Sequence, residues 1–404
     1  MRIAYTYLDR QDVMPIHSLE MIRELSRLGH DVTLYASLTP ASAPAGDLIR
    51  LGVEIIRIRS LPVRVLNEFF FLVCLGLQLM RHGLRRRPDI IYIRHASPSL
   101  VAGWVGKLLR VPVCLEINDI LLKRTDYREI PFPKRLWVRF YERFAFPLAA
   151  RLFPVTEGIN GWLQNVHGIP AGVVQTMPNG VNLERFRPGD AQACRIRFSL
   201  PPGAQVVGYL GSIFHWAGLE TLIDAAPEIV RRMPDTLFVV GGGDEPCYTQ
   251  LMERVRTVEF ADHFRFFGAV DWKDASDFIN TFDLAVAPAF FKNAESGISS
   301  QKVLAYLACG KPVVGSDLRG LGDMLESHQV GKSFRMGDSQ SLAQVILRCL
   351  SEKSLLEDMQ RKARPFVEAH YAWHEIVKRA AGHMAGLLRT SPGRLAGKEP
   401  ARCP

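Results

Sequence analysis

The stretch QVVGYLGSIFHWAGLETLIDAAPEIVRRMPDTLFVVGGG, residues 205–243, decides the fold. It opens with a short apolar run at 205–211 that is typical of a buried strand. Apolar residues then recur with helical spacing over 219–232, and a second apolar run follows at 236–243. A strand, a helix and another strand in this order predict a βαβ unit with two parallel strands.

The same alternation extends in both directions from this stretch. Towards the C-terminus it predicts helices over 245–260, 273–281 and 300–309, and strands over 264–270, 284–289 and 312–317. Towards the N-terminus it predicts a helix over 18–28 that ends at Gly29, and strands over 1–7, 31–37, 54–60, 90–95 and 112–118. The expected fold class is α/β, with two doubly wound, Rossmann-like domains that face each other across a cleft and bind ligands at the carboxyl ends of their strands.

The segment VVQTMPNGVNLERFRPGD, residues 173–190, is rich in Pro, Gly and Asn and reads as the connection between the two domains. We therefore predict a first domain over 1–185 and a second over 186–365. We expect 366–390 to form a helix that crosses back to the first domain. The tail 391–404 is rich in Gly, Pro and charge and is expected to be disordered.

Composition favours a reducing compartment. The seven cysteines are odd in number, scattered and never in CxxC spacing, which argues against disulfides and zinc. The N-terminus lacks the features of a signal peptide, and the longest apolar run, 69–77, is far shorter than the roughly 20 residues that span a bilayer. We expect a cytoplasmic protein that either stays in solution or lies on the inner face of the membrane.

The most informative motif is ESGISSQKVLAYLACGKPVV, residues 295–314. A glycine-containing loop leads into a helix that begins at Ser299 and Ser300 and ends at Gly310. Helix N-termini bind phosphate, and Lys302 in the first turn is placed to reach the same anion. From the residues alone, a capped helix with a solvated lysine remains an equal alternative.

This motif resembles the donor-binding motif of retaining glycosyltransferases of the GT-B fold, family 4 (glycosyl transferases group 1). The matching positions are Glu295, Gly297, Ile298, Ser299, Lys302, Tyr306, Gly310 and Pro312. Further pieces of the same family pattern occur in the expected order at 177–188, 208–225, 238–245, 266–274 and 370–376, so the resemblance covers nearly the whole chain.

The resemblance implies a retaining hexosyltransferase that uses a nucleotide sugar. It assigns Glu295 to the donor sugar hydroxyls and Ala269 with Val270 to the base edge. The diphosphate is assigned to Lys302 and to the glycine turns and helix start. Those turns and that helix start contribute Gly211, Ser212, Gly243, Gly297, Ile298, Ser299 and Ser300.

Three positions depart from the family pattern. The family usually has an acid at the position of Ala305 and basic residues at those of Ser212 and Ala217. His215 is one of the residues expected to compensate for the lost cations. A catalytically weak, glycosyltransferase-like binding subunit is therefore an alternative. A third hypothesis is a sugar-nucleotide epimerase of the same fold, which would need further acids and histidines in the cleft that this sequence does not show.

In the first half, PVCLEIND, residues 112–119, ends a strand at the expected cleft. Asn118 stands where family members often have a histidine that contacts the donor sugar. We assign Glu116, Asp119, Arg94 and His95 to the acceptor side. The alternatives are that 116–119 only caps a turn and that His95 is structural.

The partners follow from the remaining signals. There is no DxD motif, so we expect no essential metal and no cofactor. The segments 67–87 and 134–146 combine apolar or aromatic residues with Arg, which suits an anionic membrane, although 67–80 reads equally well as a core helix. Nucleic acid is not expected despite the net charge of +9, because no nucleic-acid module occurs. The expected acceptor is a sugar, lipid-linked or a precursor of surface polysaccharide.

Overall fold

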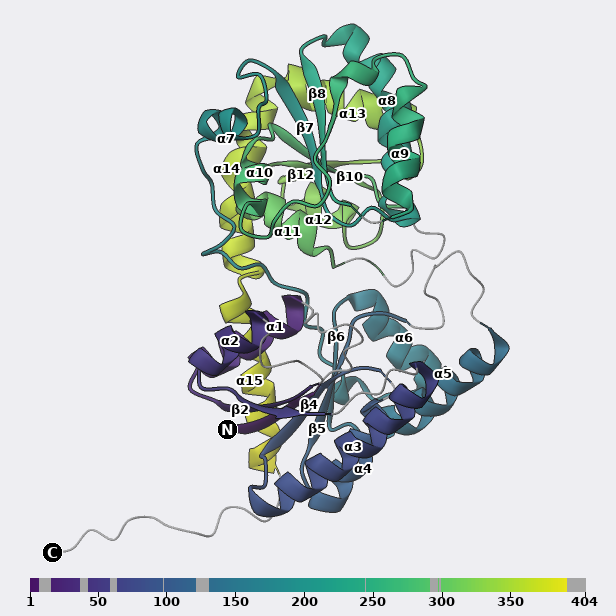
Figure 1. Cartoon of the computed structure of the whole chain (residues 1–404), viewed down its shortest axis with the longest axis vertical. Coiled ribbons are helices and arrows are strands. Elements are labelled where there is room, and N and C mark those ends of the chain that lie inside the picture. The colour runs from purple at the N-terminus through teal and green to yellow at the C-terminus, as the bar shows by residue number, and fades with distance from the viewer. Residues whose placement is uncertain are drawn as a thin grey trace, which may run out of the picture. The chain divides into compact units, whose positions relative to one another are not determined.

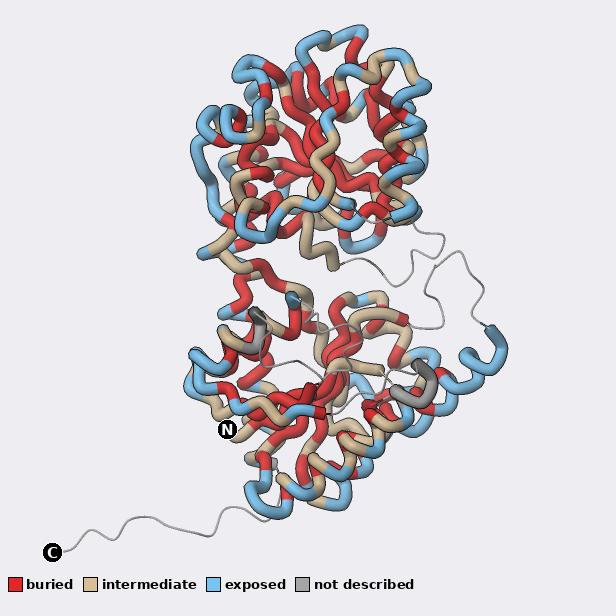
Figure 2. The backbone as a smooth tube through the Cα atoms, viewed as in Figure 1, coloured by how far each residue is buried: buried red, intermediate tan, exposed pale blue. Residues whose placement is uncertain are grey.

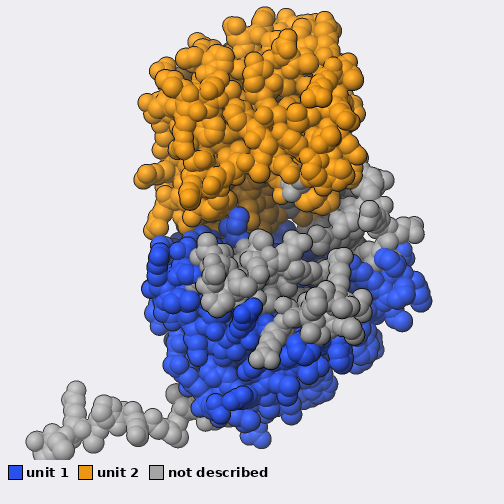
Figure 3. Space-filling model, viewed as in Figure 1, with its two compact units in different colours: residues 1–178, 374–404 blue, residues 179–373 orange. Residues whose placement is uncertain are grey.

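The computed structural model describes residues 1–6, 16–36, 43–58, 64–96, 98–120, 131–243, 245–290, 297 and 299–390, with the side chains of 43–45, 64–68 and 390 outside the description. The chain forms two compact units, shown in Figures 1 and 3. Unit 1 contains residues 1–178 and 374–404, and unit 2 contains residues 179–373.

Unit 1 is built on a parallel six-stranded sheet in the order β3-β2-β1-β4-β5-β6. Its strands are β1 (Arg2–Thr6), β2 (Asp31–Ala36), β3 (Glu54–Arg57), β4 (Ile90–Arg94), β5 (Val113–Ile117) and β6 (Arg151–Pro154). Its helices are α1 (Ile16–Arg27), α2 (Ala43–Arg50), α3 (Arg64–Arg85), α4 (Pro98–Leu109), α5 (Phe132–Ala145), α6 (Glu157–His167) and α15 (Trp373–Thr390).

Unit 2 repeats this architecture, with the sheet order β12-β11-β10-β7-β8-β9. Its strands are β7 (Gln205–Leu210), β8 (Thr236–Gly241), β9 (Phe264–Phe266), β10 (Leu284–Ala287), β11 (Val313–Ser316) and β12 (Gly331–Phe334). Its helices are α7 (Ala191–Arg197), α8 (Leu219–Arg232), α9 (Cys247–Arg256), α10 (Ala275–Asn280), α11 (Gln301–Ala308), α12 (Gly322–Ser327), α13 (Ser339–Ser351) and α14 (Lys353–His370).

Both sheets therefore have the strand order of a doubly wound fold, and the predicted α/β class is confirmed. In each sheet the first strand of the unit lies beside its fourth strand, and the helical connections leave this pair towards opposite edges. Ligands of such sheets bind at this switch point, at the carboxyl ends of the strands. The switch points here lie after β1 and β4 in unit 1 and after β7 and β10 in unit 2.

The central strands are mostly apolar and are buried along their whole length because helices cover both faces of each sheet. Every residue of β5, β8, β10 and β11 is buried, as the red tube in Figure 2 shows. Helix α3, over the segment predicted either to meet a membrane or to lie in the core, packs Phe71, Leu75 and Leu79 into the core of unit 1. Among the described residues, no helix combines the length and the apolarity needed to cross a bilayer.

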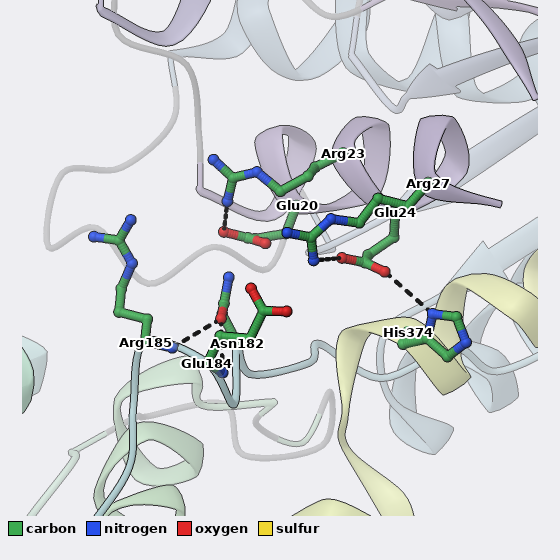
Figure 4. Close-up of polar contacts among 8 residues, drawn as sticks. All are labelled: Glu20, Arg23, Glu24, Arg27, Asn182, Glu184, Arg185 and His374. Carbon is green, nitrogen blue, oxygen red and sulfur yellow. Dashed lines mark hydrogen bonds and ion pairs between the residues drawn. The ribbon is translucent and has the colours of Figure 1, made fainter. Parts of the chain in front are cut away.

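The last helix returns to unit 1. Helix α15 buries Ile376, Val377 and Met384, and Nδ1 of His374 lies 3.3 Å from the carboxylate of Glu24 on α1 (Figure 4). The same carboxylate accepts a hydrogen bond of 2.9 Å from Arg27.

The observed boundaries lie at 178/179 and 373/374 rather than at the predicted 185/186 and 365/366. Backbone pairing explains both differences. The N–H of Val181 donates to the carbonyl of Tyr371 at 2.8 Å, and Val181 pairs in parallel with Ala372. Residues 179–185 are thereby tied to the segment after α14, and both belong to unit 2. The predicted disordered tail, 391–404, lies outside the described residues.

Candidate functional site

Lys302 lies at the switch point of unit 2. It stands in the first turn of α11, and its Nζ donates a hydrogen bond of 2.7 Å to the hydroxyl of Tyr209 in β7. The Tyr209 hydroxyl donates in turn to the carbonyl of Ser212 at 2.7 Å. A Cβ atom placed on Gly211 would lie 3.3 Å from Nζ of Lys302, so the ammonium group sits directly over the turn that follows β7. The structure thus brings Lys302 beside Gly211, and Tyr209 links Lys302 to the carbonyl of Ser212.

Helix α11 is fixed to β7 by a buried tyrosine. The hydroxyl of Tyr306 donates to the carbonyl of Leu210 at 2.7 Å and accepts from the N–H of Leu210 at 2.9 Å. Burial raises the pKa of Tyr306, so this hydroxyl remains a donor at physiological pH. The end of β7 and the second half of α11 are therefore held together.

The N-terminus of α11 is tied to the segment at the start of unit 2. Asn179 donates from its backbone N–H to the hydroxyl of Ser299 at 3.0 Å and from its side chain to the carbonyl of Ser299 at 2.9 Å. Gly297 adopts a positive φ of 68°, and Ser300 occupies the N-cap position without a side-chain capping bond. The first N–H groups of the helix have no acceptor within it, so they are available to an anion.

The two neighbouring strand ends supply further predicted donor residues. A Cβ atom on Gly243 would lie 3.0 Å from the N atom of Ala269, so the turns after β8 and β9 touch. Gly243 and Ala269 are exposed and Val270 is half-buried. His215, exposed in the loop after β7, has its Nε2 3.7 Å from Sγ of Cys247. Glu295 and Ile298 lie outside the described residues.

In unit 1, Glu116 is the centre of a buried polar network at the end of β5. Its carboxylate lies 2.7 Å from Nε2 of His17 on α1, accepts from the hydroxyl of Tyr92 at 3.0 Å, and accepts from the side chain of Asn118 at 2.5 Å. Burial alone would raise the pKa of Glu116. His17, Arg94 and the Asn118 amide outweigh burial and lower it to about 2. The predicted residue Asn118 is therefore held in place by an ionised carboxylate.

Arg94 is the last residue of β4 and lies beside this network. Within the described part of the chain, its buried Nη1 makes no hydrogen bond, and the same is true of the hydroxyls of Thr6 at the end of β1 and Ser18 in the first turn of α1. Buried polar groups without partners are uncommon in folded proteins and are a reason to look for a ligand. Asp119 is half-buried at the same strand end.

His95 does not join this group. Its Nδ1 lies 3.1 Å from the hydroxyl of Ser99, its ring packs on Tyr141 and Phe146, and its side chain is 2% exposed. The ring is turned towards α5 because Glu142, a buried carboxylate of that helix, lies 3.9 Å from its Nε2. Nε2 of His95 is buried and has no hydrogen-bond partner among the described residues, so its assignment to the acceptor side stays a prediction.

Comparison with known proteins assigns the chain to a family. The model described as Glycosyltransferase Family 4 matches residues 14–185, and the model described as Glycosyl transferases group 1 matches residues 204–352. This chain is a family 4 glycosyltransferase. Together the two matches cover all of the strands except β1, and the chain is a transferase that uses a nucleotide sugar.

Relatives and solved structures agree with this assignment. The enzyme is 26% identical to D-inositol 3-phosphate glycosyltransferase 2 of Catenulispora acidiphila, with 89% of this chain and 86% of the relative covered. A glycosyltransferase from Rickettsia africae superposes with a TM-score of 0.79 at 15% identity, covering 96% of this chain and 99% of the other. An Anabaena protein, HepE, solved with UDP and glucose, superposes with a TM-score of 0.73 at 17% identity, covering 95% and 99%. The fold is GT-B.

Of the three positions at which this glycosyltransferase departs from the family pattern, two are buried and one is exposed. Ala305 and Ala217 are 7% and 2% exposed and belong to the two hydrophobic clusters of unit 2, whereas Ser212 is exposed. A charged side chain at either alanine position would have to leave the core to reach a ligand. Lys302 is the cation that the structure places over the turn after β7.

Sequence reasoning assigned no role to several residues that position the enzyme's site. Tyr209, Asn179 and Tyr306 orient Lys302 and α11, and His17 and Tyr92 hold Glu116. Tyr209 and Tyr306 stand within motifs that the sequence analysis quotes. His17 could have been found because it begins the helix after the first strand, next to the strand ends that carry the other candidates.

Proposed function

We propose that this enzyme transfers a hexosyl group, with retention of configuration, from a nucleoside diphosphate sugar to a hydroxyl group of a lipid-linked acceptor that serves surface polysaccharide assembly. The bond between the anomeric carbon and the diphosphate oxygen breaks, and a bond between that carbon and the acceptor oxygen forms. The acceptor proton passes to the departing diphosphate. Negative charge therefore grows on the leaving group during the reaction, and fixed cations and N–H donors accelerate it.

The observation that carries the proposal is the position of Lys302 over the turn after β7, at the start of α11. Its ammonium group is held by Tyr209, and the helix that carries it is held by Tyr306 and Asn179. A preorganised cation beside a helix N-terminus is suited to a diphosphate. Ala269 and Val270 would meet the base, Glu295 would meet the sugar hydroxyls, and Asn118 would contact the sugar from unit 1.

The acceptor side of the proposal rests on unit 1. Arg94, whose buried Nη1 has no hydrogen-bond partner among the described residues, would bind a polar or phosphorylated group of the acceptor beside Glu116 and Asp119. The relative from Catenulispora is named for a phosphorylated acceptor, which agrees with an arginine in this position. The six described cysteines are free thiols, which supports action on the cytoplasmic side of the membrane.

The first test is thermal unfolding of the purified protein with UDP and with GDP. At about 100 times the dissociation constant, a nucleotide stabilises the state that binds it by roughly 2.7 kcal/mol. We expect one of the two nucleotides to raise the melting temperature and the Lys302→Ala variant to lose this shift. The matched control is Lys353→Ala, which removes an exposed lysine at the start of α14 and should keep the shift.

An unshifted melting temperature with both nucleotides, in protein that unfolds cooperatively, would overturn the assignment of the donor site. An equal shift in wild type and Lys302→Ala would overturn the role of this lysine. Retention itself is tested by determining the anomeric configuration of the product by NMR with a donor of known configuration.

A further inference from the structure

Helix α5 has a second apolar side that the fold of unit 1 does not use. Phe132 and Leu136 are 75% and 59% exposed, and Trp137, Phe140 and Phe144 are between 43% and 46% exposed. The three rings form a continuous ladder. Trp137 stacks on Phe140 at 5.7 Å, and Phe140 contacts Phe144 at 4.9 Å between centroids. We refer to Phe132, Leu136, Trp137, Phe140 and Phe144 as the aromatic face.

The core of unit 1 is packed by a different side of this helix. Val138, Tyr141 and Ala145 are buried with helical spacing. They lie on a different side of the helix from the aromatic face. A surface helix of a globular domain needs a single apolar stripe, and the side away from the core is ordinarily polar. Exposed aromatic side chains in a continuous patch mark an interaction surface.

The exposed charges that helix α5 itself places around the aromatic face have one sign. Lys134, Arg135, Arg139 and Arg143 are all exposed. The helix Phe132–Ala145 contains a single acid, Glu142, which is 1% exposed and faces His95 and His167 inside unit 1. The solvent side of α5 thus offers aromatic rings and cations without a carboxylate.

The neighbouring helices continue this surface. Connections between parallel strands are right-handed, so α3, α4 and α5 cover the same face of the sheet, and Figure 1 shows them side by side. On α4, Trp104 and Leu108 are 50% and 70% exposed, and Nζ of Lys107 lies 5.2 Å from the Trp104 ring centre. On α3, Phe69 and Leu77 are about as exposed as these residues.

We propose that the aromatic face of α5 docks the enzyme on an anionic lipid bilayer. Aromatic rings enter the interface between headgroups and acyl chains, and flanking arginines bind anionic headgroups. Charge complementarity selects this occupant, because helix α5, as the structure describes it, places cations and no exposed acid around the aromatic face. The inference rests on the proposed function only in that a lipid-linked acceptor gives the docking its purpose. It adds the surface through which the membrane is bound.

The test is cosedimentation of the full-length protein with vesicles of phosphatidylcholine alone and of phosphatidylcholine mixed with phosphatidylglycerol. Wild type should bind the mixed vesicles more tightly, and salt should weaken this binding. Trp137→Glu with Phe140→Glu should lower the affinity for the mixed vesicles by about 30-fold. Arg139→Gln with Arg143→Gln should lower it by a similar factor, about 30-fold, and should leave binding to phosphatidylcholine unchanged.

The matched control places glutamates at exposed apolar residues elsewhere, Val166→Glu on α6 and Ile196→Glu on α7, which are 66% and 70% exposed in the native chain. This variant should bind vesicles like wild type. The proposal is overturned if wild type does not bind mixed vesicles, if the α5 variants bind as tightly as wild type, or if they change only the oligomeric state. Vesicle binding without transfer to a lipid-linked acceptor would overturn the proposed function alone. Transfer to such an acceptor in detergent without vesicle binding would overturn this inference alone.

Discussion

Glu116 is a carboxylate held inside unit 1 by side chains from three elements: His17 from α1, Tyr92 from β4 and Asn118 from the segment after β5. Burial and the adjacent Glu116 raise the pKa of Tyr92 well above its ordinary value, so the phenol stays protonated and donates. Each partner of the carboxylate favours its ionised form. This network fixes the strand end from which Asn118 and Asp119 project.

The lowered pKa of Glu116 makes a prediction about stability and pH. A carboxyl group whose pKa is lower in the folded state stabilises that state above its unfolded pKa and loses this contribution as the pH falls towards its folded pKa. The window for Glu116 runs from the ordinary value of 4.5 down to about 2. Glu116→Gln should lower the free energy of unfolding at neutral pH by about 1–3 kcal/mol, because it leaves buried groups poorly paired.

Urea unfolding of wild type and Glu116→Gln across this pH range checks the prediction. The difference between the two proteins should be constant at neutral pH and should shrink as the pH falls below 4.5. A difference that is the same at every pH would show that the carboxylate is not preferentially ionised in the folded protein.

At the scale of elements, the loop between β7 and α8 depends on one glycine. Gly218 has a φ of 68° and forms the N-cap of α8, and a Cβ atom there would lie 1.8 Å from the carbonyl oxygen of Pro288. Both the positive φ and the close backbone approach favour glycine. This loop carries Ser212 and His215, so its path decides where the predicted donor residues lie.

Gly218→Ala should therefore lower the free energy of unfolding by about 3 kcal/mol and weaken nucleotide binding, because the loop after β7 must move away from Pro288. The matched control is Gly203→Ala, where an added Cβ atom meets nothing within 4 Å. Urea unfolding and nucleotide titration of both variants measure the two effects. Equal behaviour of the two variants would contradict the steric argument.

Two strands that the sequence pattern did not predict are short. Strands β6 (Arg151–Pro154) and β12 (Gly331–Phe334) each span four residues, too few for periodicity to distinguish them from loop. Helix α9 ends at Arg256, earlier than the predicted 260, and Phe260 has a φ of 71° that no right-handed helix can contain. In each case pairing with a neighbouring strand or local backbone geometry, rather than composition, sets the limit of the element.

At the scale of the whole molecule, the end of the chain completes the core of the unit that contains its beginning. Met384 and Val377 on α15 are fully buried in unit 1, although more than 190 residues of unit 2 separate them in sequence from α6. Unit 1 is thus assembled from two distant parts of the chain.

Met384→Ala should lower the free energy of unfolding by about 2–5 kcal/mol, since it removes a buried side chain and leaves a cavity. Lys378→Ala, on the exposed side of the same helix, should change it by less than about 0.5 kcal/mol. Urea unfolding followed by circular dichroism measures both. A Met384→Ala variant as stable as the lysine variant would show that α15 contributes little to the core.

The sequence by itself determined the α/β class, the parallel strands, the donor motif around Lys302 and the family, because alternating apolar runs and a helix start with glycine and lysine are local patterns. Only the tertiary structure decided which side chains surround them. It turned His95 towards Glu142, joined His17 to Glu116, put Tyr209 beneath Lys302 and left the aromatic face of α5 in solvent. The physical reason is that the two residues of each pair come from different elements of the chain. Their contacts, and the side of α5 that is left exposed, depend on strand order and helix packing, which no short stretch of sequence encodes.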